Sequence, residues 1–180
     1  MSGSKILLLV VLAACFFASC EKTPAYDAAT QLKIDDDSIA KFILSNAIPA
    51  TKTPQGLYYQ ILKSGQDTAA TTVVDSLYIH YVAKLMLTQR EFDSTSTINI
   101  DSLATKFLLK DAIQGWELGI PLIRPGGHIR LLVPSPLAYQ NRTIGTILTT
   151  SYLPPNSILD FDIQLIRVIN PSNFKKPKTQ

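Results

Sequence analysis

The chain has 180 residues, of which 46% are hydrophobic and 17% are charged, and its formal net charge is +3. This composition supports a packed core and excludes wholesale disorder. The small net charge and the absence of any block of five like charges argue against a nucleic-acid-binding surface. The length suits one domain with a tether.

The first residues have the pattern of an export signal. Lys5 precedes an apolar run at 6–18, which is shorter than the roughly 20 residues of a membrane-spanning helix but suits the apolar region of a signal peptide. The run ends in Ala-Ser-Cys, small residues before a cysteine, as in a bacterial lipobox. We therefore expect residues 1–20 to be a lipoprotein signal peptide ending at a lipidated Cys20. The lipid would anchor the protein in the bacterial cell envelope, facing the periplasm or at the outer membrane.

Other interpretations of this segment remain open. Cys15 follows Leu-Ala-Ala and is a second candidate for lipidation, and an ordinary cleaved signal or a single membrane anchor fits the same run. Cys20 is favoured because the use of Cys15 would leave Phe16 and Phe17 at the start of the mature chain. Both cysteines lie in the leader, so the body of the chain can form no disulfide.

Residues 21–55 are predicted to hold a tether and one helix. Segment 21–33 is polar and is interpreted as the tether. The aspartates at 35–37 suit a helix start, because acidic side chains interact favourably with the helix dipole. Apolar residues follow at helical spacing, which predicts a helix over 36–47 that Pro49 ends.

The body of the chain, 56–170, has the alternation of β-strands. Strands are predicted at 56–62, 77–87, from 91, 106–109, 128–133 and 158–169. One short helix is predicted at 111–118, closed by Gly119. The predicted fold class is α+β: an antiparallel sheet of about five strands curled over one short helix, with the N-terminal helix added. Residues 171–180 are interpreted as a polar tail.

Five sequence pieces between 77 and 169 occur in a family-specific order. They are Ile79-His80-Tyr81, Glu91-Phe92-Asp93-Ser94, Ala112-Ile113-Gln114-Gly115-Trp116-Glu117-Leu118-Gly119, Val133-Pro134-Ser135-Pro136-Leu137-Ala138-Tyr139 and Leu153-Pro154-Pro155-Asn156-Ser157-Ile158-Leu159-Asp160-Phe161-Asp162. In this order they resemble the FKBP-type peptidyl-prolyl isomerases, the family that binds rapamycin. Segment 53–59 is similar to that of exported bacterial members, including macrophage-infectivity-potentiator-like proteins, and the layout resembles envelope lipoproteins of Bacteroidetes.

The resemblance implies an aromatic pocket. Its implied catalytic residues are Asp93, Trp116, Tyr139 and Phe161. Its implied substrate-binding residues are Tyr81, Phe92, Phe107, Ile113 and Leu153, with the register of Phe107 open by one or two positions. Trp116 would be the floor under the prolyl ring. The Tyr139 hydroxyl and the backbone N–H of Ile113 would donate to substrate carbonyls, and Asp93 would lie at the rim.

Such a pocket suits isomerisation of X–Pro bonds, whose barrier of about 18–20 kcal/mol comes from amide resonance. No bond breaks, so neither a nucleophile, a metal nor a cofactor is required. A dry aromatic pocket favours the twisted amide, because the planar, more dipolar amide loses more solvation on entering it. The implied partners are proline-containing polypeptides and rapamycin-like macrolides. His80 and His128 are interpreted as structural residues without a metal role.

Two function hypotheses follow. The first is an isomerase that assists folding of envelope or secreted proteins. The alternative is a non-catalytic binding module or chaperone in an envelope machine for gliding or secretion, suggested by Gln140 where the family has glycine and by Ala112 where it has valine. The loop 140–152 frames the implied pocket mouth and is expected to set client choice or to be a surface elaboration. Arg124, Arg130 and Arg142 are interpreted as surface charges.

Overall fold

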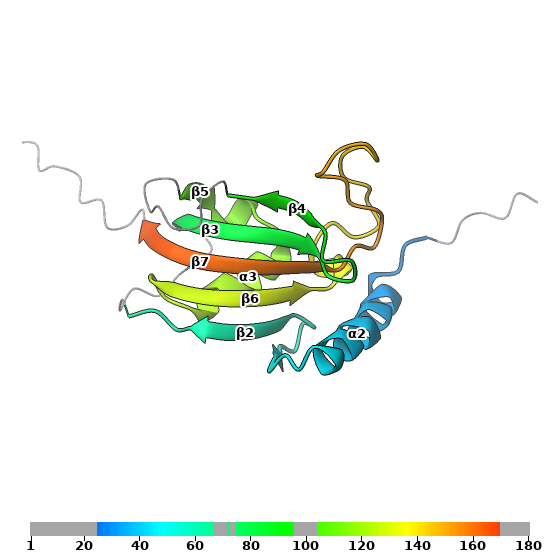
Figure 1. Ribbon diagram of the computed structural model, residues 1–180, viewed down its shortest axis with the longest axis horizontal. Coiled ribbons are helices and arrows are strands. Elements are labelled where there is room, and N and C mark those ends of the chain that lie inside the picture. Colours follow the sequence, from blue (N-terminus) through cyan, green and yellow to red (C-terminus); the bar gives the residue numbers. More distant parts are fainter. Residues whose placement is uncertain (1–24, 67–71, 73–74, 96–103, 170–180) are drawn as a thin grey trace, which may run out of the picture.

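The computed structural model describes residues 25–66, 72, 75–95 and 104–169 (Figure 1). Its seven-stranded sheet has the order β1-β2-β6-β7-β3-β4, and β5 also pairs with β3. The strands are β1 (Thr51–Lys52), β2 (Tyr58–Lys63), β3 (Ser76–Leu85), β4 (Glu91–Ser94), β5 (Thr105–Leu108), β6 (Gly127–Val133) and β7 (Leu159–Ile169). Every pairing is antiparallel. The predicted α+β class is confirmed, with a two-residue strand, β1, added to the sheet.

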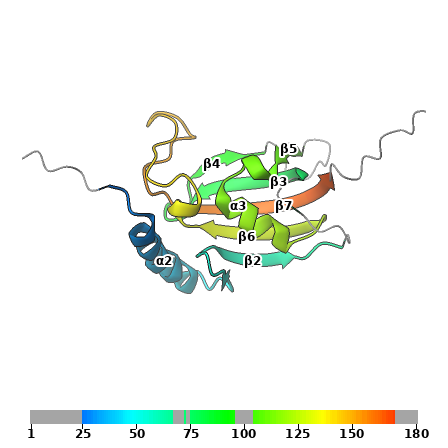
Figure 2. The same cartoon turned by 180° about the vertical axis from the view of Figure 1, so that it is seen from behind.

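Among the residues that the structure describes, two α-helices accompany the sheet. Helix α2 (Ala28–Ser45) lies beside one end of the sheet, and the short helix α3 (Gln114–Gly119) covers one face (Figures 1 and 2). The 3₁₀ helices of this part of the chain include η3 (Leu109–Asp111), η4 (Ile120–Leu122) and η5 (Ser135–Leu137). Within the described residues, no helix is both long and apolar enough to span a membrane.

The main core lies between α3 and the face of the sheet that it covers. Alternate residues of β7 from Leu159 to Leu165 are buried there, as strand geometry requires. Helix α3 approaches β6 closely because it has glycine at two contact positions. A Cβ atom at Gly115 would collide with Val133, and one at Gly119 would lie 2.6 Å from Leu131 Cδ2. The glycines therefore set the depth at which α3 packs.

Helix α2 begins earlier than the sequence pattern predicted. It starts at Ala28 rather than near residue 36, and the Asp27 carboxylate caps it by accepting from the Ala29 N–H at 3.0 Å. Residues 28–33 of the predicted tether are therefore helical. The predicted C-terminal end is close to the observed one at Ser45, and Pro49 follows. Residues 1–24, with Cys15 and Cys20, and the tail 171–180 lie outside the described residues.

A buried carboxylate ties α2 to the segment that precedes Tyr139. Asp35 is 2% exposed, and it accepts from the Ser135 backbone N–H at 2.7 Å and from the Ser135 hydroxyl at 2.6 Å. Gln31 Nε2 donates to the same carboxylate at 2.7 Å. Ile39 of α2 packs in a second apolar cluster with Met86, Leu132 and Ile158. The acidic run at 35–37 is therefore mid-helix, and Asp35 acts through tertiary contacts rather than on the helix dipole.

Candidate functional site

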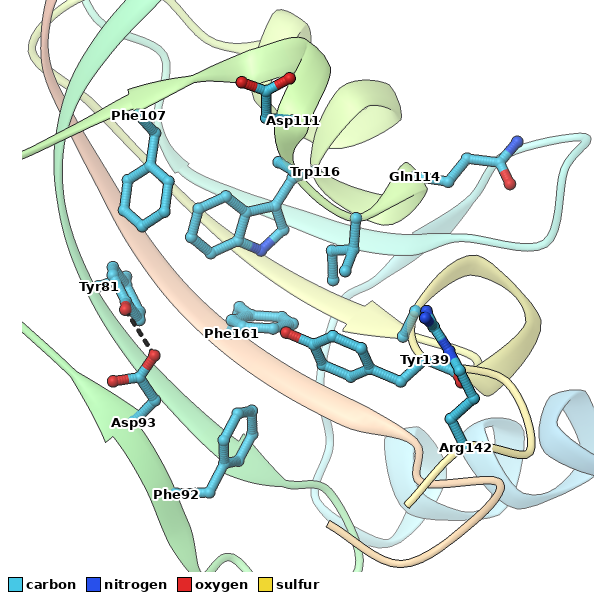
Figure 3. A pocket seen from close by; sticks show the side chains of 13 residues that line it. Tyr81, Phe92, Asp93, Phe107, Asp111, Gln114, Trp116, Tyr139, Arg142 and Phe161 are labelled. Carbon is cyan, nitrogen blue, oxygen red and sulfur yellow. Dashed lines mark hydrogen bonds between the residues drawn. The ribbon is translucent and has the colours of Figure 1, made fainter. Parts of the chain in front are cut away.

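A cavity of about 400 Å³ opens between α3, the strands β3, β4 and β5, and the segment that follows η5 (Figure 3). Its lining consists of Tyr81, Phe92, Asp93, Phe107, Asp111, Ala112, Ile113, Gln114, Trp116, Ala138, Tyr139, Arg142 and Phe161. These residues come from segments that are far apart in the sequence, and the curvature of the sheet over α3 brings them together.

Trp116 lies at the centre of an aromatic cluster. It is 5% exposed, and its ring centroid lies 5.3 Å from those of Tyr81 and Phe161 and 5.4 Å from that of Phe107. Phe92 extends the cluster, with its ring 6.2 Å from that of Phe161. All these pairs are edge-on, the arrangement that aligns ring edges with ring faces. The cluster gives the cavity a rigid apolar floor.

The rim of the cavity has a carboxylate held by a buried phenol. The Tyr81 hydroxyl donates to Asp93 Oδ2 at 2.6 Å (Figure 3). Burial, and then this hydrogen bond to the carboxylate, raise the pKa of Tyr81 well above its usual 10.0, so the phenol remains a donor at neutral pH. Asp93 itself is exposed at the end of β4. Its carboxylate is thus oriented by Tyr81 while it faces the cavity mouth.

Three hydrogen-bond donors that belong to lining residues have no acceptor among the described residues. Tyr139 projects its hydroxyl toward Phe161 and Trp116 (Figure 3), and burial followed by the negative charge of Asp93 raises the pKa of Tyr139. The Trp116 indole nitrogen is buried and unpartnered in this part of the chain. The backbone N–H of Ile113, at the start of α3, has no partner there either. Because buried donors are rarely left unpaired, the Trp116 nitrogen suits an acceptor supplied by a ligand, and the half-buried Tyr139 and Ile113 have donors available to one as well.

Eight of the nine residues expected to form the pocket line this one cavity: Tyr81, Phe92, Asp93, Phe107, Ile113, Trp116, Tyr139 and Phe161. The open register of Phe107 is resolved, since its side chain lies against Trp116. Leu153, the ninth, is not among the lining residues. It is 1% exposed in the main core, and its backbone forms an antiparallel bridge with Ile144.

Three polar lining residues were not expected, namely Asp111, Gln114 and Arg142. Arg142 was interpreted as a surface charge, and the available signal was its position three residues after Tyr139, within reach of one turn. Arg130 was interpreted in the same way, but it donates to both oxygens of the buried Asp160, at 2.9 and 2.6 Å.

Both histidines lie on strands away from the cavity lining. His80 is fully buried with Nδ1 3.3 Å from Thr95 Oγ1, and His128 Nε2 lies 2.6 Å from Asp162 Oδ1. Within the described ranges, no cluster of three or more potential metal ligands is present. The cavity therefore offers an apolar floor for a small ring, donors for carbonyl groups and one oriented carboxylate.

Comparison with known proteins finds relatives of this chain. The family model of FKBP-type peptidyl-prolyl cis-trans isomerases matches residues 68–166. FkpA of Buchnera aphidicola is 36% identical over 120 residues, covering 67% of this chain and 44% of the relative. The macrophage infectivity potentiator of Trypanosoma cruzi is 32% identical over 119 residues, covering 66% of this chain and 56% of the relative.

Solved structures show the same fold. The crystal structure of FkpA from Escherichia coli has a TM-score of 0.59 and 27% identity, covering 93% of this chain and 73% of that chain. A peptidyl-prolyl isomerase from Pseudomonas syringae gives a TM-score of 0.61 at 23% identity, covering 83% of this chain and 100% of that chain. The chain spans about half the length of the curated relatives that it matches. It belongs to the family of FKBP-type peptidyl-prolyl cis-trans isomerases.

Proposed function

We propose that this protein catalyses cis-trans isomerisation of X–Pro peptide bonds in unfolded or extended polypeptides. The observation that carries the proposal is the aromatic cavity with Trp116 as its buried floor, in a domain of this family. A proline ring on that floor would place its preceding amide in an apolar environment. The planar amide is the more dipolar form, so desolvation raises its free energy more than that of the twisted form, and the rotation barrier falls.

Each polar group has a distinct part in this scheme. The unpartnered N–H of Ile113 and the hydroxyl of Tyr139 would donate to carbonyls of the bound chain, which fixes one side while the other rotates. Asp93, oriented by Tyr81, would lie near the rotating amide. An acceleration of 10⁶-fold requires about 8 kcal/mol from these effects together.

The test is the isomerisation rate of a short X–Pro peptide with purified variants. Asp93→Ala and Phe161→Ala should lower kcat/KM strongly, and Tyr139→Phe should lower it less, because only one hydrogen bond is lost. Phe161→Ala should also destabilise the fold by about 3–5 kcal/mol, so the folded fraction is measured alongside.

Two controls match these substitutions. Tyr58→Phe removes a hydroxyl that donates to Asp36 at 2.7 Å outside the cavity, and Asp37→Ala removes an exposed helix carboxylate. Both control variants should keep the wild-type rate. If Asp93→Ala, Tyr139→Phe and Phe161→Ala, each shown to be folded, all turn over the peptide at the wild-type rate, the proposed roles are wrong.

We also propose that Cys20 is lipidated and holds the domain in the cell envelope, where the clients would be envelope or secreted proteins. The support is the apolar run that ends in Ala-Ser-Cys before a polar segment. In a bacterial host, the wild type should incorporate labelled palmitate and partition into detergent, and Cys20→Ala should abolish both. Loss of labelling in Cys15→Ala but not in Cys20→Ala would move the site to Cys15.

A second candidate is a binding module or chaperone with little catalysis. The observation that favours it is the apolar tip of the loop after Tyr139, where Ile147 is 76% and Leu148 is 94% exposed. Exposed apolar side chains beside a peptide-binding cavity can hold unfolded chains without acting on a bond. The peptide assay distinguishes the candidates, because a binding module would bind the X–Pro peptide without accelerating its isomerisation.

A further inference from the structure

The mouth of the cavity has opposite charges on different sides. Asp93 lies at the end of β4 and Asp111 at the end of η3, whereas Arg142 lies across the mouth on the segment after η5 (Figure 3). All three side chains line the cavity and are exposed to solvent. The aromatic floor between them is uncharged.

Arg142 is held at this place by its own backbone turn. Its backbone N–H and its side-chain Nε both donate to the Tyr139 carbonyl at 3.2 Å. This double contact fixes the guanidinium beside Tyr139, and the terminal Nη groups have no hydrogen-bond partner among the described residues. A guanidinium with free donors suits a carboxylate ligand, because its planar fork can form two parallel hydrogen bonds.

The positive charge of Arg142 is not neutralised by the negative charges at the cavity mouth. Arg142 forms no ion pair with Asp93 or Asp111 in the described part of the chain. One oxygen of Asp93 accepts from Tyr81, which leaves the other oxygen open to solvent or ligand. A chain bound in the cavity therefore meets a cation at one part of the rim and a carboxylate at each of two other parts.

We propose that this cavity selects substrates by the order of charges around the proline: it favours an acidic residue near Arg142 and a basic residue near Asp93 or Asp111. The inference deepens the proposed isomerase function and rests on it. An extended chain advances about 3.3 Å per residue, so side chains about two residues from the proline reach the rim. The preferred substrates are thus segments with an acidic residue on one side of the proline and a basic residue on the other, and the reverse arrangement is disfavoured.

The experiment compares two peptides of identical composition. One has Glu two residues before the proline and Lys two residues after it, the other has the reverse order, and a third has Gln at both positions. Because exposed charge pairs change a rate or binding constant by only a few-fold, kcat/KM should differ about fivefold between the two orders at low salt. The difference should shrink to less than about twofold in 1 M salt, where the Debye length is about 3 Å.

For each variant, kcat/KM for one charged peptide is divided by kcat/KM for the other. A general loss of activity affects both values equally and so does not change this ratio. Arg142→Gln should reduce the ratio to about twofold, and Arg142→Glu should bring it to about one or reverse it, because rim charges act with the size of exposed ion pairs. Asp111→Asn should also reduce it. Lys33→Gln, which removes an exposed cation of α2 outside the cavity, should leave the ratio unchanged.

If kcat/KM is equal for the two charge orders while the Gln peptide is turned over, the proposed selection by charge is refuted and the isomerase proposal stands. If no peptide is turned over, the isomerase proposal fails, and the same ratio is then measured as dissociation constants from Trp116 fluorescence. A ratio that is unchanged in Arg142→Glu, or equally changed in Lys33→Gln, would also overturn the assignment to the rim.

Discussion

Replacing Asp35 by alanine should weaken the docking of α2 on the rest of the domain. The carboxylate is 2% exposed, and it accepts hydrogen bonds from Ser135, which is itself fully buried, and from Gln31. After the substitution the Gln31 amide can turn toward water. The Ser135 N–H and hydroxyl would remain buried without their acceptor.

The expected loss in the free energy of unfolding follows from these two donors. A buried donor that loses its partner costs about 1–3 kcal/mol, and hydrogen bonds to charged groups lie toward the upper end of that range. Two such donors predict a loss of about 4–6 kcal/mol for Asp35→Ala, with partial relief if water enters the site. Asp37→Ala is the matched control, because Asp37 is an exposed residue of the same helix, and it should cost less than about 0.5 kcal/mol.

The assay is urea unfolding followed by two signals. Far-UV circular dichroism reports the helix, and fluorescence of the single tryptophan, Trp116, reports the core. If α2 undocks alone, the dichroism transition of Asp35→Ala should precede the fluorescence transition. Ser135→Ala should show a smaller loss, since the backbone N–H still reaches the carboxylate. Equal stability of Asp35→Ala and Asp37→Ala would refute the reasoning.

Four further predictions follow from single sites. Gln140 has a φ of +58°, which favours glycine, so Gln140→Gly should raise the free energy of unfolding by about 0.5–1 kcal/mol in urea titration, and a loss would contradict backbone strain there. Rapamycin should quench Trp116 fluorescence. Trp116→Leu should weaken rapamycin binding, measured by calorimetry, at temperatures where the Tm shows that the variant is still folded. No rapamycin binding at tens of micromolar would contradict an open pocket. Stability supported by the raised pKa of Tyr81 is fully present below pH 10.0 and should be lost as pH rises above it; Tyr81→Phe should flatten that decline in alkaline thermal melts. Ile147→Ser with Leu148→Ser should slow catalysed refolding of a proline-limited protein about tenfold while tetrapeptide turnover stays within about threefold, because only long clients reach the tip; equal losses would show that the loop supports the pocket.

Local patterns in the sequence were sufficient to predict the long strands, the family and most of the residues that line the cavity. Alternation of apolar and polar residues predicted the long strands β3 and β7 to within one or two residues, because a strand's two faces repeat every second position. The order of five short pieces predicted the family, and with it eight of the nine pocket residues. Each of these features depends on residues that are near one another in the chain, so the sequence alone is sufficient to predict it.

Contacts between distant segments were decided by the tertiary structure. Asp35 and Ser135 are 100 positions apart, and nothing in an acidic run at the middle of a helix distinguishes the buried carboxylate from its exposed neighbours. Leu153 lies in the core, and Arg142 lies at the cavity mouth, because the loop between them turns back through the Ile144 bridge. The sequence by itself determined which aromatic and apolar residues are available to line a cavity of this family. The packing of α3, the loop and α2 against one sheet decided which charges surround that site, since only the fold sets distances across the chain.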